Sequence, residues 1–262
     1  VIVLVGNHPT CDAGWAKCPK PSNGKEAVDR ESLTLEEEDL IKLVYKANSK
    51  TIVGLISSFP YAINWTQENV PSIVHMTHKS QELGNALADV LFGDYNPAGR
   101  LTQTWVKSIT DLPDFLEYDI TKGRTYMYTK NEPLYAFGYG LSYTSFEYSN
   151  LKTSKSSIAN NEEISITIDI KNTGKKDGEE VVQLYVKHLD SKIQRPIKEL
   201  KGFKRVLVEK GKKNTVKIQL KAKDLLHWDV NSQQFKLEKD SIQLQIGSAS
   251  NDIKITKNIK LN

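Results

Sequence analysis

The stretch TLEEEDLIKLVYKANSKTIVGLIS, residues 34–57, holds a helix pattern that leads directly into a strand pattern. Thr34 and Glu37 stand in the positions of a capping box, so we expect a helix to begin at Thr34. The β-branched run at 51–57 is typical of a strand that is buried on both faces. The apolar residues of the helix pattern recur at helical spacing: Leu40, Ile41, Val44 and Ala47. A helix followed by such a strand is the repeating unit of α/β folds.

The same alternation extends on both sides of this stretch. VIVLV at 1–5 and SIVHMT at 72–77 are further buried-strand runs, and SQELGNALADVLFG at 80–93 is a helix pattern that Gly93 ends. Strands that alternate with helices predict a parallel sheet covered by helices on both faces. We assign residues 1–112 to this α/β domain. Because the chain opens inside a core strand, we expect it to be cut from a longer protein.

The second half of the chain follows a different pattern. Residues 113–150 are rich in Tyr and Gly and predict a long, largely irregular connection, which is usually functional or packs across a domain interface. Residues 151–262 contain runs with the period-2 alternation of half-buried strands, and these predict an antiparallel β-sandwich domain. The runs are EISITIDIKNTG (163–174), EEVVQLYVKHL (179–189), KELKGFKRVLV (198–208), KNTVKIQLKA (213–222) and SIQLQIGSAS (241–250).

Composition and charge exclude several classes of function. The chain has 262 residues, of which 39% are hydrophobic and 26% charged, and its formal net charge is only +4. Basic residues are interspersed with acidic ones, so we expect no nucleic-acid partner. No apolar run is long enough to span a bilayer, so we expect no membrane partner. Cys11 and Cys18 fit either a disulfide or two free thiols, whereas a metal site is not expected from a single pair with this spacing.

Four longer motifs carry a resemblance to a known family. They are GNALADVLFGDYNPAGRLTQTW (84–105), EPLYAFGYGLSYTSFEY (132–148), IKNTGKKDGEEVVQLYV (170–186) and RPIKELKGFKRV (195–206). In this order they resemble the C-terminal portion of family 3 glycoside hydrolases, in which an α/β domain precedes a fibronectin type III-like domain. The resemblance implies a retaining, exo-acting β-glucosidase or β-xylosidase that acts on oligosaccharides or on aryl and alkyl β-glycosides.

The resemblance also implies which parts of such an enzyme the chain lacks. The family's N-terminal TIM-type barrel, which supplies an Asp nucleophile, has no counterpart in this sequence. The chemistry needs no cofactor, and no metal is expected. The family suggests a periplasmic or extracellular location. The sugar, the linkage and the oligomeric state stay open, as do transglycosylation and phosphorolysis. A non-catalytic carbohydrate- or protein-binding module is the alternative function.

The resemblance places one catalytic residue in this chain. In KEAVDRESLTL, residues 25–35, Glu26 stands three residues before an Asp-Arg pair, as the acid/base does in β-xylosidase-like members of the family. Its loop follows the first strand, and the carboxyl ends of such strands are where ligands bind in open α/β sheets. Asp12 in the same loop is the runner-up. We expect Asp29 and Arg30 to form a local ion pair that shapes the loop around Glu26.

Further residues are weaker candidates for the site. Trp15 fits a sugar-stacking platform or a packing role at an interface. Arg124 lies in GRTYMY, which resembles a family motif at the edge of the substrate site, although packing of aromatic side chains explains the motif too. His75 and His78 predict only a strand end and the turn into the next helix, since metal binding would need a further ligand.

Overall fold

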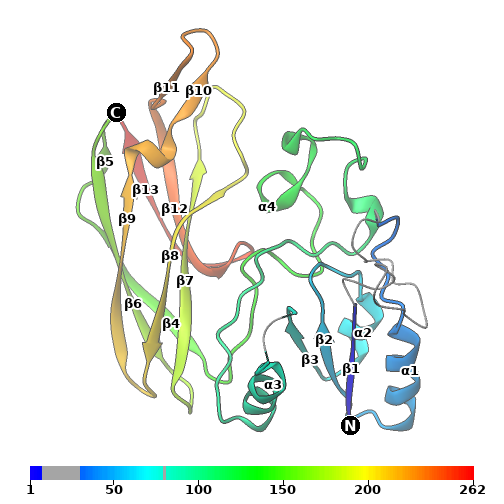
Figure 1. The fold of residues 1–262 in the computed structure, drawn as a ribbon. Helices are drawn as coiled ribbons and strands as arrows, with labels where there is room; N and C mark the ends of the chain where they lie inside the picture. The colour runs from blue at the N-terminus through cyan, green and yellow to red at the C-terminus, as the bar shows by residue number, and fades with distance from the viewer. Residues whose placement is uncertain (8–29, 79–80) are drawn as a thin grey trace. The chain divides into compact units, whose positions relative to one another are not determined.

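The computed structural model describes residues 1–7, 30–78 and 81–262, which form two compact units (Figure 1). The α/β unit comprises Val1–Ala88, Thr104–Leu116 and Asn131–Tyr135. The sandwich unit comprises Asp89–Gln103, Glu117–Lys130 and Ala136–Asn262. Within the described part of the chain, no helix has both the length and the apolar character that a membrane span requires.

A parallel sheet in the order β1-β2-β3 is the centre of the α/β unit. Its strands are β1 (Ile2–Gly6), β2 (Ile52–Ile56) and β3 (Ser72–Met76). β2 and β3 lie inside their predicted runs, and β1 extends one residue beyond its run, to Gly6. In β2, residues 53–55 are all buried, as expected for a central strand with both faces covered. The predicted parallel α/β arrangement is therefore confirmed.

The helices of this part are α1 (Glu38–Ala47), α2 (Asn64–Asn69) and α3 (Leu83–Phe92). The prediction that α1 begins at Thr34 is wrong, because the hydroxyl of Thr34 is hydrogen-bonded to that of Ser32 at 2.7 Å and the helix begins four residues later. The prediction that Gly93 ends α3 is confirmed. Gly93 has a φ of +83°, which a residue without a Cβ adopts at little energetic expense.

The sandwich unit contains two layers around one apolar core, and their strands pair antiparallel except for β5, which is parallel to β13. The predicted runs form β6 (Glu163–Asn172), β7 (Gly178–His188), β8 (Glu199–Val208), β9 (Lys213–Lys221) and β12 (Asp240–Ala249). The sequence reasoning had not singled out β4 (Phe146–Thr153), β5 (Ser157–Ile158), β10 (His227–Asp229), β11 (Gln234–Lys236) and β13 (Asp252–Leu261).

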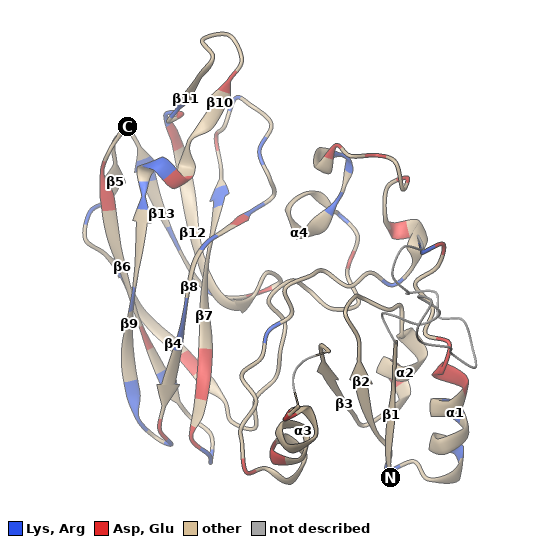
Figure 2. Ribbon diagram, in the orientation of Figure 1, with Lys and Arg blue, Asp and Glu red and all other residues tan. Residues whose placement is uncertain are grey.

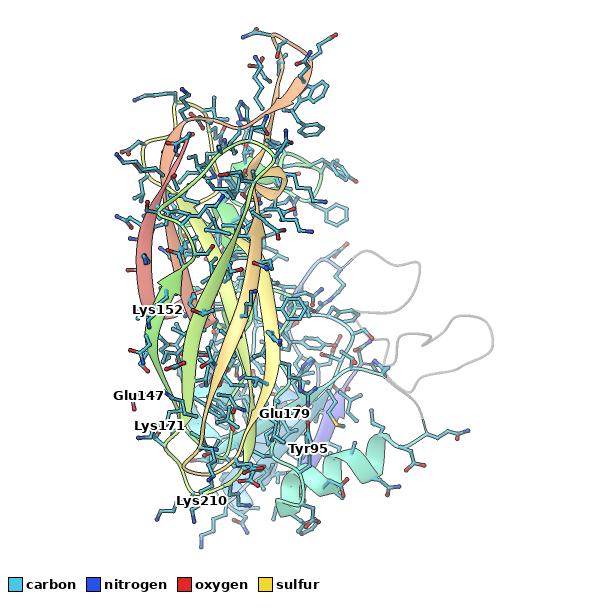
Figure 3. The ribbon with its side chains drawn as sticks, turned by 90° about the vertical axis from the view of Figure 1, so that its left-hand side faces the viewer. Tyr95, Glu147, Lys152, Lys171, Glu179 and Lys210 are labelled. Carbon is cyan, nitrogen blue, oxygen red and sulfur yellow. The ribbon has the colours of Figure 1, made fainter. Side chains whose placement is uncertain are left out.

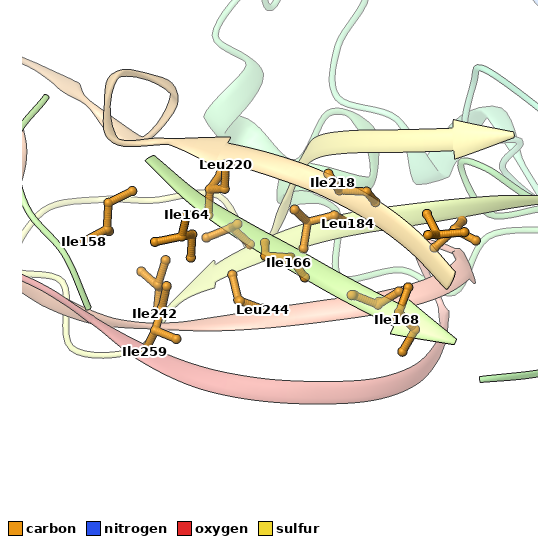
Figure 4. Close-up of a cluster of buried hydrophobic side chains, with 14 of the residues drawn as sticks. Ile158, Ile164, Ile166, Ile168, Leu184, Ile218, Leu220, Ile242, Leu244 and Ile259 are labelled. Carbon is orange, nitrogen blue, oxygen red and sulfur yellow. The ribbon is translucent and has the colours of Figure 1, made fainter. Parts of the chain in front are cut away.

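One layer has the strand order β5-β13-β12-β7-β8 and the other has the order β4-β6-β9, while β10 and β11 form a separate hairpin. Alternate residues of the two layers meet in the core, which Figure 4 shows in close-up. Ile166, Leu184 and Leu244 are fully buried there. The predicted β-sandwich is confirmed. Figure 2 shows basic and acidic positions interspersed over its strands, in keeping with the small net charge.

The sandwich unit also includes segments of the chain that come before β4, and these segments pack against the strands of the sandwich. They contain two short helices, η2 (Ile120–Lys122) and α4 (Thr125–Tyr128), whereas η1 (Ile109–Asp111) belongs to the α/β unit and η3 (Ala222–Leu225) follows β9. Arg100 forms a buried ion pair of 3.0 Å with Glu180 on β7. Tyr95 and Arg205 both donate hydrogen bonds to Glu179, a contact that lies among the charged side chains labelled in Figure 3.

Candidate functional site

The carboxyl-end edge of the parallel sheet is the candidate site, because that edge is where the Glu26 segment leaves β1. Glu26, Asp12, Trp15 and Asp29 lie outside the described residues, as do both cysteines, so their predicted roles stay predictions. The structure does describe the residues at both ends of this segment, Asn7 and Arg30. The site is therefore built from these two residues and the side chains that hold them.

Asn7, directly after β1, is buried and is held through three of its polar groups. Its backbone nitrogen donates to the backbone carbonyl of Ile56 at 3.1 Å. Its side-chain Oδ1 accepts a hydrogen bond of 3.2 Å from the backbone nitrogen of Ser58, and its carbonyl accepts one of 2.6 Å from Nε2 of His78. Residues that follow β2 and β3 thus fix the position at which the chain leaves β1.

The partners of His78 determine its tautomer. A carbonyl oxygen can only accept, so Nε2 of His78 must carry a hydrogen when it contacts Asn7. Neutral His78 then has a free lone pair on Nδ1, and the hydroxyl of Ser58 lies 2.8 Å from that atom and donates to it. Ser58 therefore orients the imidazole that holds Asn7.

A second histidine at this edge is part of the packing. Ser57 donates its hydroxyl hydrogen to the carbonyl of Phe59 at 3.0 Å, so Nε2 of His75, at 3.1 Å, donates to the Ser57 oxygen. Burial lowers the pKa of His75, and its ring packs edge-on against buried Trp105 at a centroid distance of 5.1 Å. His75 is thus neutral at pH 7 and fully used in packing, in line with the prediction that it marks a strand end.

Arg30 is held at the other end of the Glu26 segment. Its Nη1 donates to the carbonyl of Pro60 at 2.9 Å, and its guanidinium lies 4.2 Å from the ring centroid of Phe59 and 4.8 Å from that of Tyr61. Burial lowers the pKa of Arg30, and nearby Tyr61 and Glu36 oppose this shift. The group stays cationic at any working pH. Its contacts with two aromatic faces are cation–π interactions.

Arg124 was predicted, with Trp15, to contact the sugar; it lies within the described residues and belongs to the sandwich unit. It precedes α4, and its Nε donates to the carbonyl of Glu117 at 2.7 Å. Its neighbour Tyr126 stacks on Phe137 at 4.5 Å between centroids and accepts a hydrogen bond from the backbone nitrogen of Leu200. The aromatic side chains of this motif therefore pack within the unit, and a sugar-binding role for Arg124 stays a prediction.

A second cluster of titratable side chains lies in the sandwich unit and comprises His188, Glu238 and Asp240. His188 Nδ1 lies 2.7 Å from Asp240, whose other oxygen accepts from the backbone nitrogen of Asp190 at 2.8 Å. Glu238 forms an ion pair of 3.0 Å with Arg195. Because these carboxylates already accept from protein donors, the cluster ties the loop between β7 and β8 to β12.

Sequence reasoning missed Asn7 and Ser58 as contributors to the site. A signal was present, since Asn7 and Ser58 are polar residues within two positions of the end of a predicted strand, in VGN (5–7) and LISS (55–58). The carboxyl ends of neighbouring parallel strands meet at one edge, so polar residues there lie close together. The contact from His78 back to Asn7 depends on the register of three strands.

Comparison with known proteins gives two family matches. Residues 1–143 match the Glycosyl hydrolase family 3 C-terminal domain, and residues 180–250 match the Fibronectin type III-like domain. These matches agree with the resemblance carried by the four motifs and with the order of the two domains.

Individual relatives are similar over most of this chain. Thermostable beta-glucosidase B of Acetivibrio thermocellus is 34% identical over 90% of this chain and 33% of its own length. A beta-xylosidase of Formosa agariphila is 34% identical over 95% of this chain and 34% of its own length. The crystal structure of Beta-glucosidase from Kluyveromyces marxianus in complex with glucose aligns with a TM-score of 0.85 and 34% identity, over 100% of this chain and 32% of that one. The chain thus spans about a third of the length of these relatives.

Proposed function

The chain belongs to glycoside hydrolase family 3, matching the C-terminal portion of its members, and we propose that it supplies the acid/base of a retaining, exo-acting β-glycosidase. The substrate class proposed is a terminal β-glucoside or β-xyloside, as the names of the two relatives indicate. The observation that supports the proposal is the position of Asn7 and Arg30, the described residues on either side of the Glu26 segment in the sequence, whose partners follow β2 and β3. The carboxyl ends of such strands are where ligands bind in open α/β sheets.

Retaining hydrolysis needs two carboxyl groups about 5–5.5 Å apart. In the proposed mechanism, an Asp of an N-terminal barrel attacks the anomeric carbon while Glu26 protonates the departing glycosidic oxygen. Glu26, now ionised, then takes a proton from water, and this water displaces the Asp from the sugar with net retention of configuration. The chain by itself holds the acid/base without the nucleophile, so we expect the isolated chain to be inactive.

Leaving-group dependence tests the role of Glu26. Glu26→Gln in the full-length protein removes the acid, and we expect a loss of about 10²–10⁴-fold on alkyl glycosides, whose leaving groups need protonation. An activated aryl glycoside should lose much less, because its leaving group departs without protonation. Asp12→Asn is the matched comparison. Equal losses on both substrates for Glu26→Gln would refute the role, and a selective loss in Asp12→Asn alone would move it to Asp12.

The proposal also requires a longer polypeptide. An antibody against the sandwich unit should detect a native product larger than this chain by at least a barrel, about 250 residues. A native product no larger than this chain would refute the enzyme and favour a binding module. We also propose a periplasmic or extracellular location, and the same antibody applied to cell fractions would test it.

A further inference from the structure

We propose that the hairpin of β10 and β11 binds a neutral glycan through Trp228 and Phe235. These two residues and the tip residues Asn231 and Gln233 are called the hairpin platform. Trp228 and Phe235 are directly opposite each other in the strand register, so both side chains lie on one face of the hairpin. Their rings pack edge to face with centroids 5.2 Å apart, yet 51% of Trp228 and 67% of Phe235 is exposed. An exposed aromatic pair of this kind marks an interaction site.

The base of the hairpin is fixed to the sandwich, so the platform is in place before a ligand binds. Leu225, which precedes β10, is buried in the apolar core, and Leu237, which follows β11, packs against that core. Arg195 forms an ion pair of 3.0 Å with Glu238 and donates from Nη2 to Nδ1 of His227 at 3.3 Å. Figure 1 shows the hairpin extending from this base beyond the two layers. A preorganised surface loses little conformational entropy on binding.

The charges of the hairpin complement a neutral ligand. Lys236 donates to Asp229 at 2.8 Å, so the one lysine and the one aspartate of residues 227–236 neutralise each other. Each is the sequence neighbour of an aromatic residue, which places both on the face opposite Trp228 and Phe235. The aromatic face therefore offers ring surface without a charged side chain of the hairpin.

Exposed amides at the tip of the hairpin supply polar contacts. Asn231 and Gln233 are exposed, and their side chains make no hydrogen bond among the described residues. Their amides can donate to and accept from sugar hydroxyls. Gln233 also has a φ of +51°, a left-handed conformation that glycine adopts more easily. A side chain that is kept at such a position points to a function of its amide.

Other classes of partner fit the hairpin platform less well than a glycan. A stable protein interface buries about 800 Å² on each side, which is far more than two rings and a narrow tip provide. Stacking sites for nucleic acids lie in cationic grooves, and anionic membranes attract unpaired lysines, whereas Lys236 is paired. Sugars with equatorial hydroxyls, such as β-linked glucose and xylose, expose C–H groups on both ring faces. These faces pack on aromatic rings while the hydroxyls reach the amides.

Glycan retention tests the site without any hydrolysis. This chain and the full-length protein are run in native gels that contain arabinoxylan or mixed-linkage β-glucan, and we expect both polymers to retard them. The choice of polymers rests on the proposed substrate class, whereas the site does not depend on the acid/base. Trp228→Ala should weaken binding by about tenfold or more, because a large apolar contact is lost. Phe203→Ala on β8 is the matched control, since Phe203 is 66% exposed but lies outside the platform.

Gln233→Gly separates binding from folding. It removes the amide and suits the positive φ, so the chain should be no less stable in urea while its affinity falls about two- to tenfold. This variant tests the site even if Trp228→Ala unfolds the hairpin. In the full-length protein, hydrolysis of a small aryl glycoside should be unchanged by either substitution. Failure of the proposed acid/base would therefore leave the retention result intact.

Four outcomes would overturn the inference. The first is that neither polymer retards the parent chain, and the second is that Phe203→Ala weakens retention as much as Trp228→Ala does. Retention of this chain without retention of the full-length protein would show that another part of the longer protein covers the platform. Self-association in analytical ultracentrifugation that Trp228→Ala abolishes would make a second copy of the chain the partner instead.

Discussion

Gly138 packs so closely on Gln183 within the sandwich unit that a single methyl group should disrupt a buried hydrogen-bond network. Its φ is +81°, and a Cβ built there would lie 2.9 Å from Cδ of Gln183 and closer still to Oε1. Gln183 is 3% exposed and donates from Nε2 to the carbonyls of Gly138 and Ser248, while Tyr185 donates to its Oε1. Gly138→Ala must therefore push this side-chain amide away from its partners.

Two contributions set the expected loss of stability. Placing an L-residue at positive φ costs about 1–2 kcal/mol, and leaving the buried amide of Gln183 without its partners costs about 1–3 kcal/mol more. Gly211→Ala separates the two contributions. Gly211 has a similar φ of +72°, and a Cβ there would meet no atom within 4 Å. This control should lose only the backbone contribution.

Urea unfolding of the chain, followed by far-UV circular dichroism, measures both variants. Amide exchange in β7 identifies the transition that belongs to the sandwich unit. We expect Gly138→Ala to be about 1–3 kcal/mol less stable than Gly211→Ala. Equal free energies of unfolding for the two variants would show that the Gln183 network adjusts without loss, and this reasoning would be wrong.

Three further predictions concern the sandwich unit. Ile166→Ala should lower the free energy of unfolding by about 2–5 kcal/mol because it opens a cavity in a fully buried layer, whereas Leu207→Ala on exposed β8 should change it by less than about 0.5 kcal/mol in the same urea assay. Arg100→Met should cost about 3–5 kcal/mol because it leaves the carboxylate of Glu180 buried without its cation, and recovery in a double variant with Glu180→Leu is the check. Hydrogen bonds from Thr215, Asn150 and Lys213 lower the pKa of Asp169 in the folded protein. The stability that this carboxylate contributes is therefore present above its unfolded pKa of about 4 and is lost as the pH falls towards its folded pKa. Urea midpoints measured from pH 7 to pH 2.5 should fall less steeply in Asp169→Asn than in the parent chain, and parallel curves would contradict this.

Much of the fold followed from local pattern. The run at 51–57 predicted β2 because its residues are β-branched and its centre is buried on both faces. The start of α1 was missed because Thr34 bonds to its neighbour Ser32 instead of capping the helix. The short α2 was not predicted, since six residues show too little periodicity. The alternating pattern DIKITKNIKL, residues 252–261, is typical of the strand β13 that it forms. It begins two residues after the predicted strand at 241–250, and sequence reasoning did not recognise it as a separate strand.

The site was less accessible to sequence reasoning than the fold. Its position at the carboxyl edge followed from the order of strands, and Arg30 was expected to shape the Glu26 segment. The sequence suggested Asp29 as the partner of Arg30, and this pairing stays a prediction because Asp29 lies outside the described residues. The structure adds Phe59, Pro60 and Tyr61 at the guanidinium of Arg30, which sequence reasoning did not name. Contacts of this kind depend on tertiary packing between segments about 30 residues apart, and no local pattern encodes them.

The path of the chain between the two units bears on how such proteins can be recombined. The chain passes from one unit to the other after Ala88, Gln103, Leu116, Lys130 and Tyr135. No single junction therefore yields two complete halves, and a fusion made just before β4 would transplant the sandwich without the segments that bear Arg100 and Gly138. Shuffling between family members should succeed only when those segments are transferred as one block with their own sandwich.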